Sequence, residues 1–442
     1  MSRSLAAISI VLALLAPATA RTRPRYGGTL RVETRSDPLK SPDGLARKLI
    51  FDTLTQVTGN GQVIPALAAT WSSESDNHRW VFHLRSGVHF HDGSALTSDI
   101  VVQALLAACD HCGWRARAVG DAVIITSNMS LPELPAELAR SMYAVTRRDE
   151  NGNPDGTGPF RFAANSNGIV FLSANDDSWQ GRPFVDAVEI YGNRAFHDQV
   201  LDFSVGKADL IEVPPELVRQ AQQDRMPLII STPPVDLLAL TMSDKQIPDE
   251  HLRESIALAV DRAALFNVIF QKQGEITASL LPNALSGYAF LFSTAANPNR
   301  SRELRGGQTM PLRLSVDTAN ATLKLAAERL ALNLTDAGWK VRVVSQTANP
   351  NAELALRLIH LEAAEAAPAL REVMQDFGAA PHDDGTDPAS LYRSERAFLQ
   401  SHTVVPLLYL PRAYGVSPRV HNLTLAPDGT PLIASASLED AK

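Results

Sequence analysis

Four histidines fall within one short segment of the chain, and imidazole is a common ligand of zinc and nickel. They are His78, His83, His89 and His91. A metal site requires their rings to converge on one point. His83 belongs to an alternating segment typical of a strand, whereas His89 and His91 flank Phe90 in a predicted loop. The spacing does not favour convergence, so we expect no metal site and no cofactor.

The chain contains two cysteines, Cys109 and Cys112, in the order C-D-H-C. A redox pair of the thioredoxin type stands where a helix begins after a strand. Here the pair follows a predicted helix over residues 99–108, so it lies at a helix end. Zinc would need further ligands, and His111 between the cysteines is badly placed to supply one. We expect a local structural disulfide; free thiols and a redox or metal role are the alternatives.

A histidine and a carboxylate stand at the end of another predicted strand, over residues 355–361. His360 lies within this end and Glu362 follows it. The carboxyl ends of strands line ligand clefts in α/β folds. His360 and Glu362 are therefore candidate ligand contacts, with a solvent-exposed face as the alternative.

Motifs for hydrolysis and phosphate transfer are missing from the sequence. A nucleophile elbow reads G-x-S-x-G, but around Ser286 the glycine positions hold Ala284 and Tyr288. The zinc-protease motif H-E-x-x-H and the phosphate loop G-x-x-x-x-G-K-[ST] do not occur. We therefore expect a protein that is not an enzyme.

Composition sets the broad class of the molecule. The chain has 442 residues, of which 45% are hydrophobic, so it can form large cores in two or three domains. The formal net charge is -7, with no basic run, which argues against a nucleic-acid partner.

The first twenty residues have the pattern of an export signal. Arg3 precedes an apolar stretch from Leu5 to Ala16, which Pro17 and the small residues Ala18-Thr19-Ala20 follow. The apolar stretch is too short to span a bilayer, although a membrane anchor is the alternative. We expect cleavage before Arg21 and a soluble, exported protein.

The elements that must position these residues alternate between strand and helix. Residues 312–316 and 339–344 read as strands around an amphipathic helix over 321–337, which predicts a βαβ unit. Residues 160–174 read as a strand and 249–270 as a helix. The sequence therefore predicts an α/β fold with antiparallel additions.

Seven blocks of the sequence, taken in order, match the pattern of a known protein family. The longest, over residues 80–101, runs from W-V-F-H-L-R-S-G-V-H-F to H-D-G-S-A-L-T-S-D-I-V. The others are GGTL at 27–30, FDTL at 51–54, IPALAATW at 64–71, GTGPF at 156–160, LRESIALAVDR at 252–262 and VPLLY at 405–409. Together they resemble the extracytoplasmic substrate-binding proteins of ABC transporters, in the class that carries oligopeptides, dipeptides and nickel (solute-binding protein family 5).

The resemblance implies a two-lobed, class II-like periplasmic-binding-protein fold with an extra subdomain and a hinge between the lobes. After the signal peptide (1–20), we expect a second lobe over 241–410 and a reduced subdomain over 56–155. The large lobe would combine 21–55, 156–240 and 411–442. The chain would then cross between lobes near Leu238 and near Pro411.

The resemblance also implies a ligand site. In the family, the loop after the first strand faces the ligand, and here that loop holds Thr34, Arg35 and Asp37. Arg35 offers a forked donor for a carboxylate. In peptide binders a Trp-Asp pair follows the strand that matches 355–361, and its aspartate binds the ligand's amino terminus. Here Glu362 stands in that place, with no tryptophan beside it.

The function implied is capture of a small solute, such as a peptide, by a monomer that delivers it to an ABC permease. The segments 100–156 and 361–391 are shorter than in typical members. A sensor or envelope chaperone that no longer transports is therefore the alternative.

Overall fold

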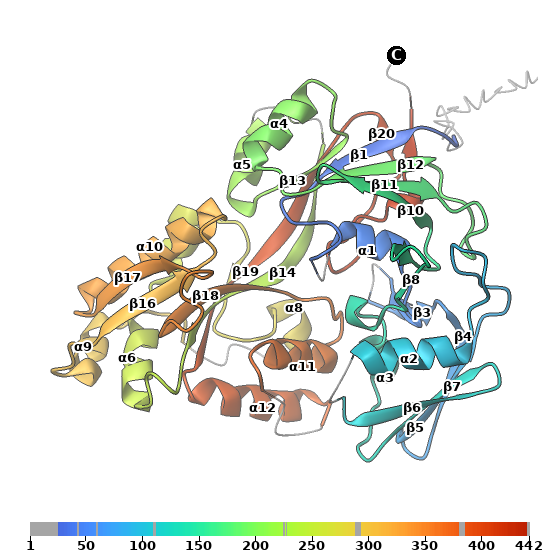
Figure 1. The fold of residues 1–442 in the computed structure, drawn as a ribbon. Helices are drawn as coiled ribbons and strands as arrows, with labels where there is room; N and C mark the ends of the chain where they lie inside the picture. The colour runs from blue at the N-terminus through green and yellow to red at the C-terminus, as the bar shows by residue number, and fades with distance from the viewer. Residues whose placement is uncertain are drawn as a thin grey trace, which may run out of the picture.

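A computed structural model describes residues 25–41, 44–58, 61–108, 112–223, 226, 228–287, 293–379 and 385–439. Its elements form a large lobe, a second lobe and a subdomain, which Figure 1 shows at the top, the lower left and the lower right. The predicted signal peptide and Cys109 lie outside the described residues. Cys112 is disulfide-bonded.

One mixed sheet runs through both lobes, in the order β10-β11-β12-β1-β13-β19-β14-β18-β16-β17, with β15 paired to β19. Its large-lobe strands are β1 (Thr29–Glu33), β10 (Phe160–Ser166), β11 (Ile169–Ala174), β12 (Ala187–Tyr191) and β13 (Leu210–Val213). Its second-lobe strands are β15 (Glu275–Ile276), β16 (Pro311–Val316), β17 (Lys340–Ser345) and β18 (Leu354–His360). β1 lies between β12 and β13 and pairs in parallel with both. The loop that follows β1 therefore starts from an interior strand of the large-lobe part of the sheet.

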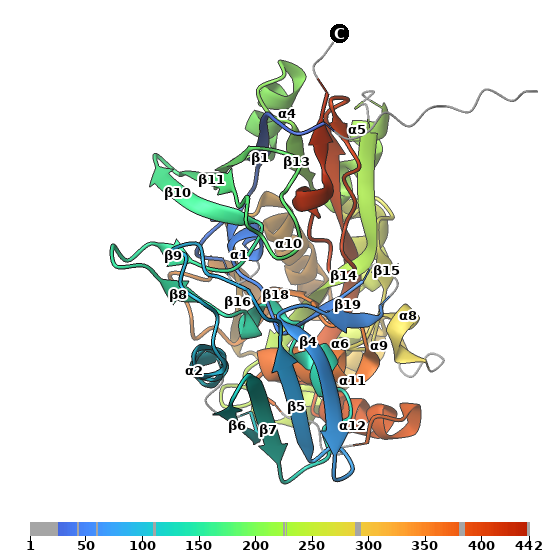
Figure 2. The ribbon, with the colours of Figure 1, turned by 90° about the vertical axis from the view of Figure 1, so that its right-hand side faces the viewer.

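Two long strands, β14 (Leu228–Met242) and β19 (Val404–Val416), connect the lobes. They run beside each other along the molecule (Figure 2). β19 pairs with β13 in the large lobe, while the far half of β14 pairs with β18 in the second lobe. Their register shifts where Pro234 faces Pro411. Proline lacks the N–H that a ladder needs, so the pairing of the two strands is interrupted at this crossing.

Helices cover both lobes. The large lobe carries α1 (Leu45–Ile50), α4 (Phe196–Ser204) and α5 (Val218–Gln223). The second lobe carries α6 (Glu250–Ala259), α7 (Arg262–Ala264), α8 (Asn283–Ser286), α9 (Pro298–Arg305), α10 (Ala321–Asp336), α11 (Ala366–Asp376) and α12 (Pro388–Gln400). None of the described helices is both long and apolar enough to cross a membrane.

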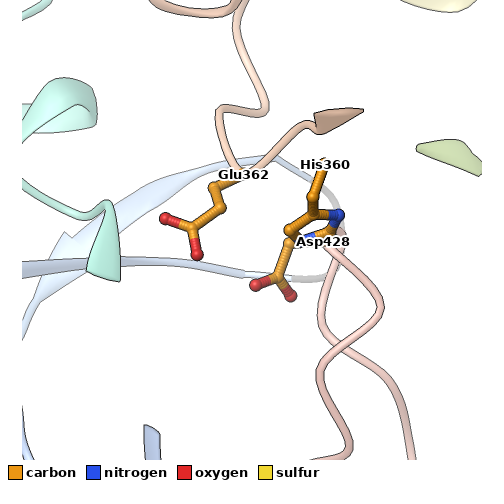
Figure 3. A group of neighbouring side chains, drawn as sticks. All are labelled: His360, Glu362 and Asp428. Atoms are coloured by element: carbon orange, nitrogen blue, oxygen red, sulfur yellow. The ribbon is translucent and has the colours of Figure 1, made fainter. Parts of the chain in front are cut away.

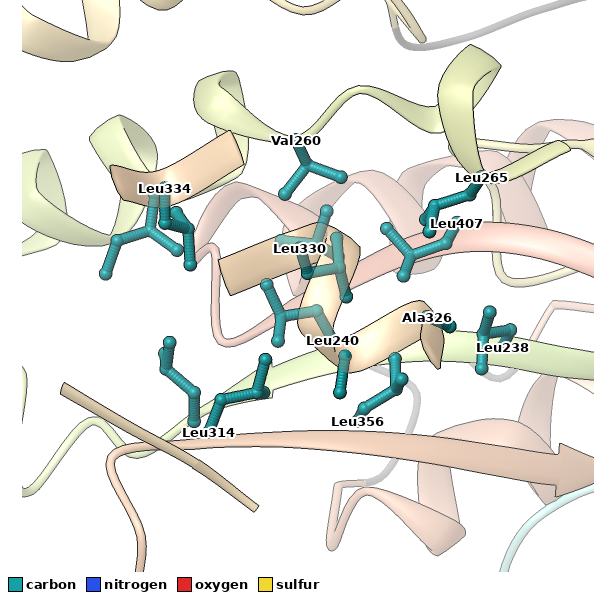
Figure 4. Close-up of a cluster of buried hydrophobic side chains, with 14 of the residues drawn as sticks. Leu238, Leu240, Val260, Leu265, Leu314, Ala326, Leu330, Leu334, Leu356 and Leu407 are labelled. Atoms are coloured by element: carbon teal, nitrogen blue, oxygen red, sulfur yellow. The ribbon is translucent and has the colours of Figure 1, made fainter. Parts of the chain in front are cut away.

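The predicted βαβ unit is confirmed in β16, α10 and β17, since β16 and β17 pair in parallel. α10 begins at a cap where the Asn320 side chain accepts hydrogen bonds from the backbone N–H groups of Thr322 and Leu323. Its apolar face, with Ala326 and Leu330 fully buried, packs onto the sheet (Figure 4). This packing forms the core of the second lobe.

The subdomain is a four-stranded antiparallel sheet in the order β4-β5-β7-β6. Its strands are β4 (Ala68–Glu74), β5 (Arg79–Leu84), β6 (Trp114–Val119) and β7 (Ala122–Ser127), and its helices are α2 (Ser98–Ala108) and α3 (Leu134–Glu137). It has its own core, in which Phe82, Val101 and Ile125 are fully buried. Three short strand pairs complete the fold: β2 (Thr55–Val57) with β3 (Val63–Pro65), β8 (Arg147–Arg148) with β9 (Pro154–Asp155), and β20 (Val420–His421) with β21 (Ser437–Leu438).

Two predicted elements were too long. The helix expected over 249–270 ends at Ala259, because Asp261 starts a new helix by accepting a hydrogen bond from the backbone N–H of Ala264. A five-residue π-helix, η3 (Leu265–Ile269), follows. The strand expected over 160–174 is the hairpin β10–β11, whose turn places Asn167 and Gly168 at positive φ.

Gly156 and Gly158 belong to the GTGPF block, and the structure gives a reason for both. A Cβ on Gly156 would lie 2.1 Å from the carbonyl oxygen of Ile50, and one on Gly158 would lie 2.6 Å from that of Leu49. The block therefore lets the chain touch the backbone at the end of α1, which holds this helix in place.

Candidate functional site

A cavity of about 400 Å³ lies where the large lobe, the second lobe and the subdomain meet. The large lobe supplies α1 with its C-terminal flank and the segment 426–435 to the cavity wall. The subdomain supplies residues from 136 to 144, and the second lobe supplies Glu362. This is a volume in which a small solute can be largely enclosed.

Lys48, on α1, holds together charges from different parts of the molecule. Its Nζ lies 2.5 Å from Asp428 Oδ2, 2.8 Å from Thr430 Oγ1 and 3.2 Å from Glu362 Oε1. Its side chain is only 11% exposed. Burial lowers the pKa of Lys48, but the two carboxylates outweigh burial and hold this pKa above its usual range. Lys48 is therefore a fixed positive charge.

Glu362, just after β18, reaches from the second lobe to both other parts. Its Oε2 accepts a hydrogen bond from the backbone N–H of Ser141 at 2.8 Å, and its Oε1 accepts one from the Ser141 hydroxyl. Burial raises the pKa of Glu362, but the charge of Lys48 outweighs it, so the pKa lies below its ordinary value. Glu362 is therefore an ionised, buried carboxylate.

His360 lies beside Glu362 and Asp428 (Figure 3). Its Nδ1 is 2.7 Å from Asp236 Oδ1, and Asp236 also pairs with Arg412 Nε at 3.0 Å. His360 Nε2 is buried and has no hydrogen-bond partner among the described residues. The carboxylate of Asp236 thus fixes the orientation of the imidazole ring.

One group of side chains has the donor atoms that a metal ion would need. A nitrogen of His360 and carboxylate oxygens of Glu362 and Asp428 lie within 4.8 Å of one another. One imidazole and two carboxylates would suit zinc or nickel. However, the ammonium of Lys48 is paired with both carboxylates.

A second set of buried charges ties the subdomain to α11. Arg140 Nη1 is 2.9 Å from Glu137 Oε1, and Arg140 Nη2 is 3.4 Å from Glu372 Oε1. Arg371 of α11 lies 3.5 Å from Glu137. Burial raises the pKa of Glu372 to about 7, although Arg140 lowers it.

Of the sequence-predicted residues, Glu362 lines the cavity and His360 lies beside Glu362, whereas Thr34, Arg35 and Asp37 make local contacts and do not line the cavity. Thr34 is buried and its hydroxyl donates to the carbonyl of Ser36. Arg35 is exposed, and its Nε lies 3.3 Å from Glu212 Oε2. Asp37 accepts hydrogen bonds from two backbone N–H groups in its own turn. The structure therefore brings His360 and Glu362 together, but it does not bring Thr34, Arg35 and Asp37 to them.

Sequence reasoning missed Lys48, Asp428, Ser141, Asp236 and Arg412. Lys48 and Asp428 are 380 positions apart, so no local spacing announces their contact. Asp236 stands between Val235 and Leu237 in an apolar part of β14, and a carboxylate within an apolar run is the signal that could have indicated it.

Comparisons with known proteins identify the family. The sequence profile of the bacterial extracellular solute-binding proteins, family 5 Middle, matches residues 62–113 and 116–386. The chain belongs to this family. The resemblance seen in the sequence is confirmed, and the family is one of substrate-binding proteins rather than enzymes.

Individual relatives agree with this assignment. The probable di/tripeptide-binding protein 5 of Pseudomonas aeruginosa is 25% identical over 401 residues, covering 77% of this chain and 76% of its own. The structure of DppA from Helicobacter pylori, in complex with the peptide STSA, superimposes with a TM-score of 0.81 at 18% identity, covering 94% of this chain and 99% of its own. NikA from Staphylococcus aureus, in complex with Ni(L-His)2, gives a TM-score of 0.78 at 16% identity, covering 93% and 100%. The expected two-lobed fold is thereby confirmed, and the chain is a solute-binding component of an ABC transporter.

Proposed function

We propose that the chain encloses a small solute in the cavity between its lobes, outside the cytoplasmic membrane, and delivers it to an ABC permease. The observation that carries this proposal is the convergence of all three parts of the molecule on one cavity of about 400 Å³. Enclosure between lobes buries most of a ligand's surface, while a few polar groups set its orientation. Such binding requires no covalent chemistry.

The lobes are held together by contacts that a hinge motion would break. Glu362 of the second lobe contacts Lys48 of the large lobe and Ser141 of the subdomain. Thr322 at the start of α10 donates to Glu216 of the large lobe. The weak pairing of β14 and β19 near Pro234 is where bending costs least. We infer that the solute enters when these contacts open and is enclosed when they re-form.

The wall of the cavity offers one cation for a ligand. Lys48 and Arg140 are paired with carboxylates, whereas Arg47 has no carboxylate partner among the described residues. Its guanidinium lies 5.7 Å from the centre of the Phe51 ring. A guanidinium binds a carboxylate through two parallel hydrogen bonds. We propose that Arg47 binds an anionic group of the solute, with Glu362 in the wall of the same cavity and His360 beside Glu362.

The test begins with native mass spectrometry of the purified protein to identify a solute that co-purifies with it. Calorimetry with that solute then compares Arg47→Ala, Arg35→Ala and Glu362→Ala with the parent protein. Loss of one charged hydrogen bond in an enclosed site costs ~2–5 kcal/mol, or roughly 30-fold and more in affinity. We expect that loss for Arg47→Ala. We also expect weaker binding for Glu362→Ala, because the contacts of Glu362 with Lys48 and Ser141 hold the lobes closed around the solute.

Arg35→Ala tests the loop that the family resemblance pointed to, and a loss of affinity there would extend the site to Thr34 and Asp37. Arg313→Ala is the control, because Arg313 pairs with Glu353 on an exposed surface of the second lobe. A dissociation constant unchanged by both Arg47→Ala and Glu362→Ala would contradict the proposed site. A thermal melt without solute separates lost binding from lost folding.

Two finer points belong to the same proposal. We propose that export removes residues 1–20, so that amino-terminal sequencing of the exported protein begins at Arg21. We also propose that the exported protein is a monomer, which light scattering would check. Retention of Leu5 to Ala16 in the exported protein would contradict the cleavage.

A further inference from the structure

We propose that Lys48 is a specificity-determining residue. Its ammonium occupies the cation position formed by Glu362, Asp428 and His360, and so keeps metal ions and ligand ammonium groups out of that position. This inference rests on the proposed function in one respect only, since it assumes that solutes reach the cavity beside Glu362.

The position has the chemistry of a cation site. Its three donor groups come from segments far apart in the chain, with His360 and Glu362 at the end of β18 and Asp428 near the C-terminus. Their nearest donor atoms lie within 4.8 Å of one another. Figure 3 shows the two carboxylates and the imidazole gathered at one place. The buried Nε2 of His360, which has no partner among the described residues, adds a lone pair or a proton to the same surroundings.

The ammonium of Lys48 itself supplies the positive charge at this position. An ammonium has three N–H donors, and the three nearest oxygens belong to Asp428, Thr430 and Glu362, at 2.5, 2.8 and 3.2 Å. The side chains of Lys48, Glu362 and Asp428 are 11%, 12% and 17% exposed. The charges are therefore paired within a site that has little water to screen them.

A second cation would find the position closed. A metal ion bound to both carboxylates would lie within a few ångströms of the Lys48 ammonium, and like charges at that distance repel strongly when they are buried. The ion could enter only if Lys48 left its three oxygens. The same argument applies to the ammonium of a peptide or amino acid. The solute of this protein is therefore one that needs no cationic group at Glu362.

NikA from Staphylococcus aureus was solved with Ni(L-His)2, and DppA from Helicobacter pylori with a peptide. In this chain Lys48 gives the carboxylate that follows β18 an internal partner. The fold is shared with both of these structures.

The experiment uses Zn²⁺ alone as the probe, measured by calorimetry on the parent protein and on Lys48→Met. Methionine has nearly the length of the lysine stem but no charge, so it leaves the two carboxylates and His360 free. We expect no saturable Zn²⁺ binding in the parent. We expect one bound Zn²⁺ in Lys48→Met, with an affinity at least ~10-fold above any residual binding by the parent.

Two further variants make the result specific. Adding Glu362→Gln to Lys48→Met should abolish the new binding, because it removes one of the carboxylate ligands. Lys324→Met is the matched control: it makes the same substitution at an exposed lysine that pairs with Glu328, and it should bind no Zn²⁺.

The proposal is overturned by a stoichiometric Zn²⁺ site in the parent that Glu362→Gln removes. It is also overturned if Lys48→Met folds and binds no Zn²⁺. If Lys48→Met is unstable alone, Zn²⁺ in the buffer should raise its melting temperature, and a melt that Zn²⁺ does not shift counts against the proposal. None of these readouts uses the natural solute, so failure here is distinguishable from failure of the proposed function.

Discussion

Asp236 is the carboxylate at which β14, β18 and β19 meet, through His360 and Arg412. Burial raises the pKa of Asp236, but the charge of Arg412 outweighs it and the pKa lies below its ordinary value. Removing one member of a buried ion pair leaves the other without compensation. We therefore expect a single substitution at Asp236 to have a large effect on the stability of the protein.

We predict that Asp236→Ala lowers the free energy of unfolding by ~3–5 kcal/mol, because it removes the buried carboxylate that both Arg412 and His360 contact. Urea denaturation measures this change. Glu303→Ala is the control, since Glu303 and Arg300 form an exposed pair, and such pairs contribute about 0–1 kcal/mol. Equal losses in the two variants would contradict the importance assigned to Asp236.

The buried carboxyl group of Glu33, at the end of β1, should make the free energy of unfolding depend on pH. Burial raises the pKa of Glu33 to about 7 from its ordinary value of 4.5, although Arg194 lowers it. Between these values the folded protein binds more protons than the unfolded chain, so the free energy of unfolding falls as pH rises. Burial also raises the pKa of Glu133 and Glu372 to about 7, so their contributions have the same sign.

We therefore predict that stability declines between about pH 5 and pH 8, and that Glu33→Gln declines less steeply because glutamine does not titrate. Urea denaturation at several pH values gives both slopes. A decline in Glu33→Gln as steep as in the parent would show that Glu33 does not retain its proton.

The candidate site shows what residue patterns can and cannot predict. His360 and Glu362 were predicted because strand ends line clefts, and this requires only a correct strand. Lys48 could not be predicted in the same way. It lies on a six-residue helix, and its partners come from the second lobe and from the C-terminal segment, so only the folded chain brings them together.

At the scale of elements, the GTGPF block positions α1, and α1 positions Lys48. We predict that Gly156→Ala destabilises the protein by at least ~1–3 kcal/mol, because the new Cβ would overlap a backbone carbonyl that cannot move aside. Thermal melts measure the effect. Gly307→Ala is the control, because Gly307 has ordinary φ and open space around its Cβ position, and it should be nearly neutral. Equal melting temperatures for the two variants would contradict the close approach.

Element boundaries explain why the fold was easier to predict than its details. The βαβ unit follows from hydrophobic periodicity alone, and it was predicted within a few residues. The helix over 249–270 was not, because its apolar spacing continues through Asp261 while that side chain caps a new helix. α11 was also missed, although its buried residues Leu370, Val373 and Met374 recur at helical spacing.

At the scale of the whole molecule, two lobes joined by β14 and β19 meet at a cavity, to which the large lobe contributes Lys48 and Asp428 and the second lobe contributes Glu362. This two-lobed architecture was predicted from the family resemblance. The matching blocks are spread over most of the chain, so they indicate the order of its elements. The predicted lobe boundaries stay a proposal, and so does the hinge near Pro234 and Pro411.

The central claim is that the solute is enclosed between the lobes, and hydrogen exchange tests it most directly. The protein is stripped of its co-purified solute, and exchange is followed by mass spectrometry with and without that solute. We predict slower exchange on solute addition in residues 44–53 and 426–435 of the large lobe and, at the same time, in residues 360–365 of the second lobe. Protection confined to one lobe, or absent from all three segments, would contradict the claim.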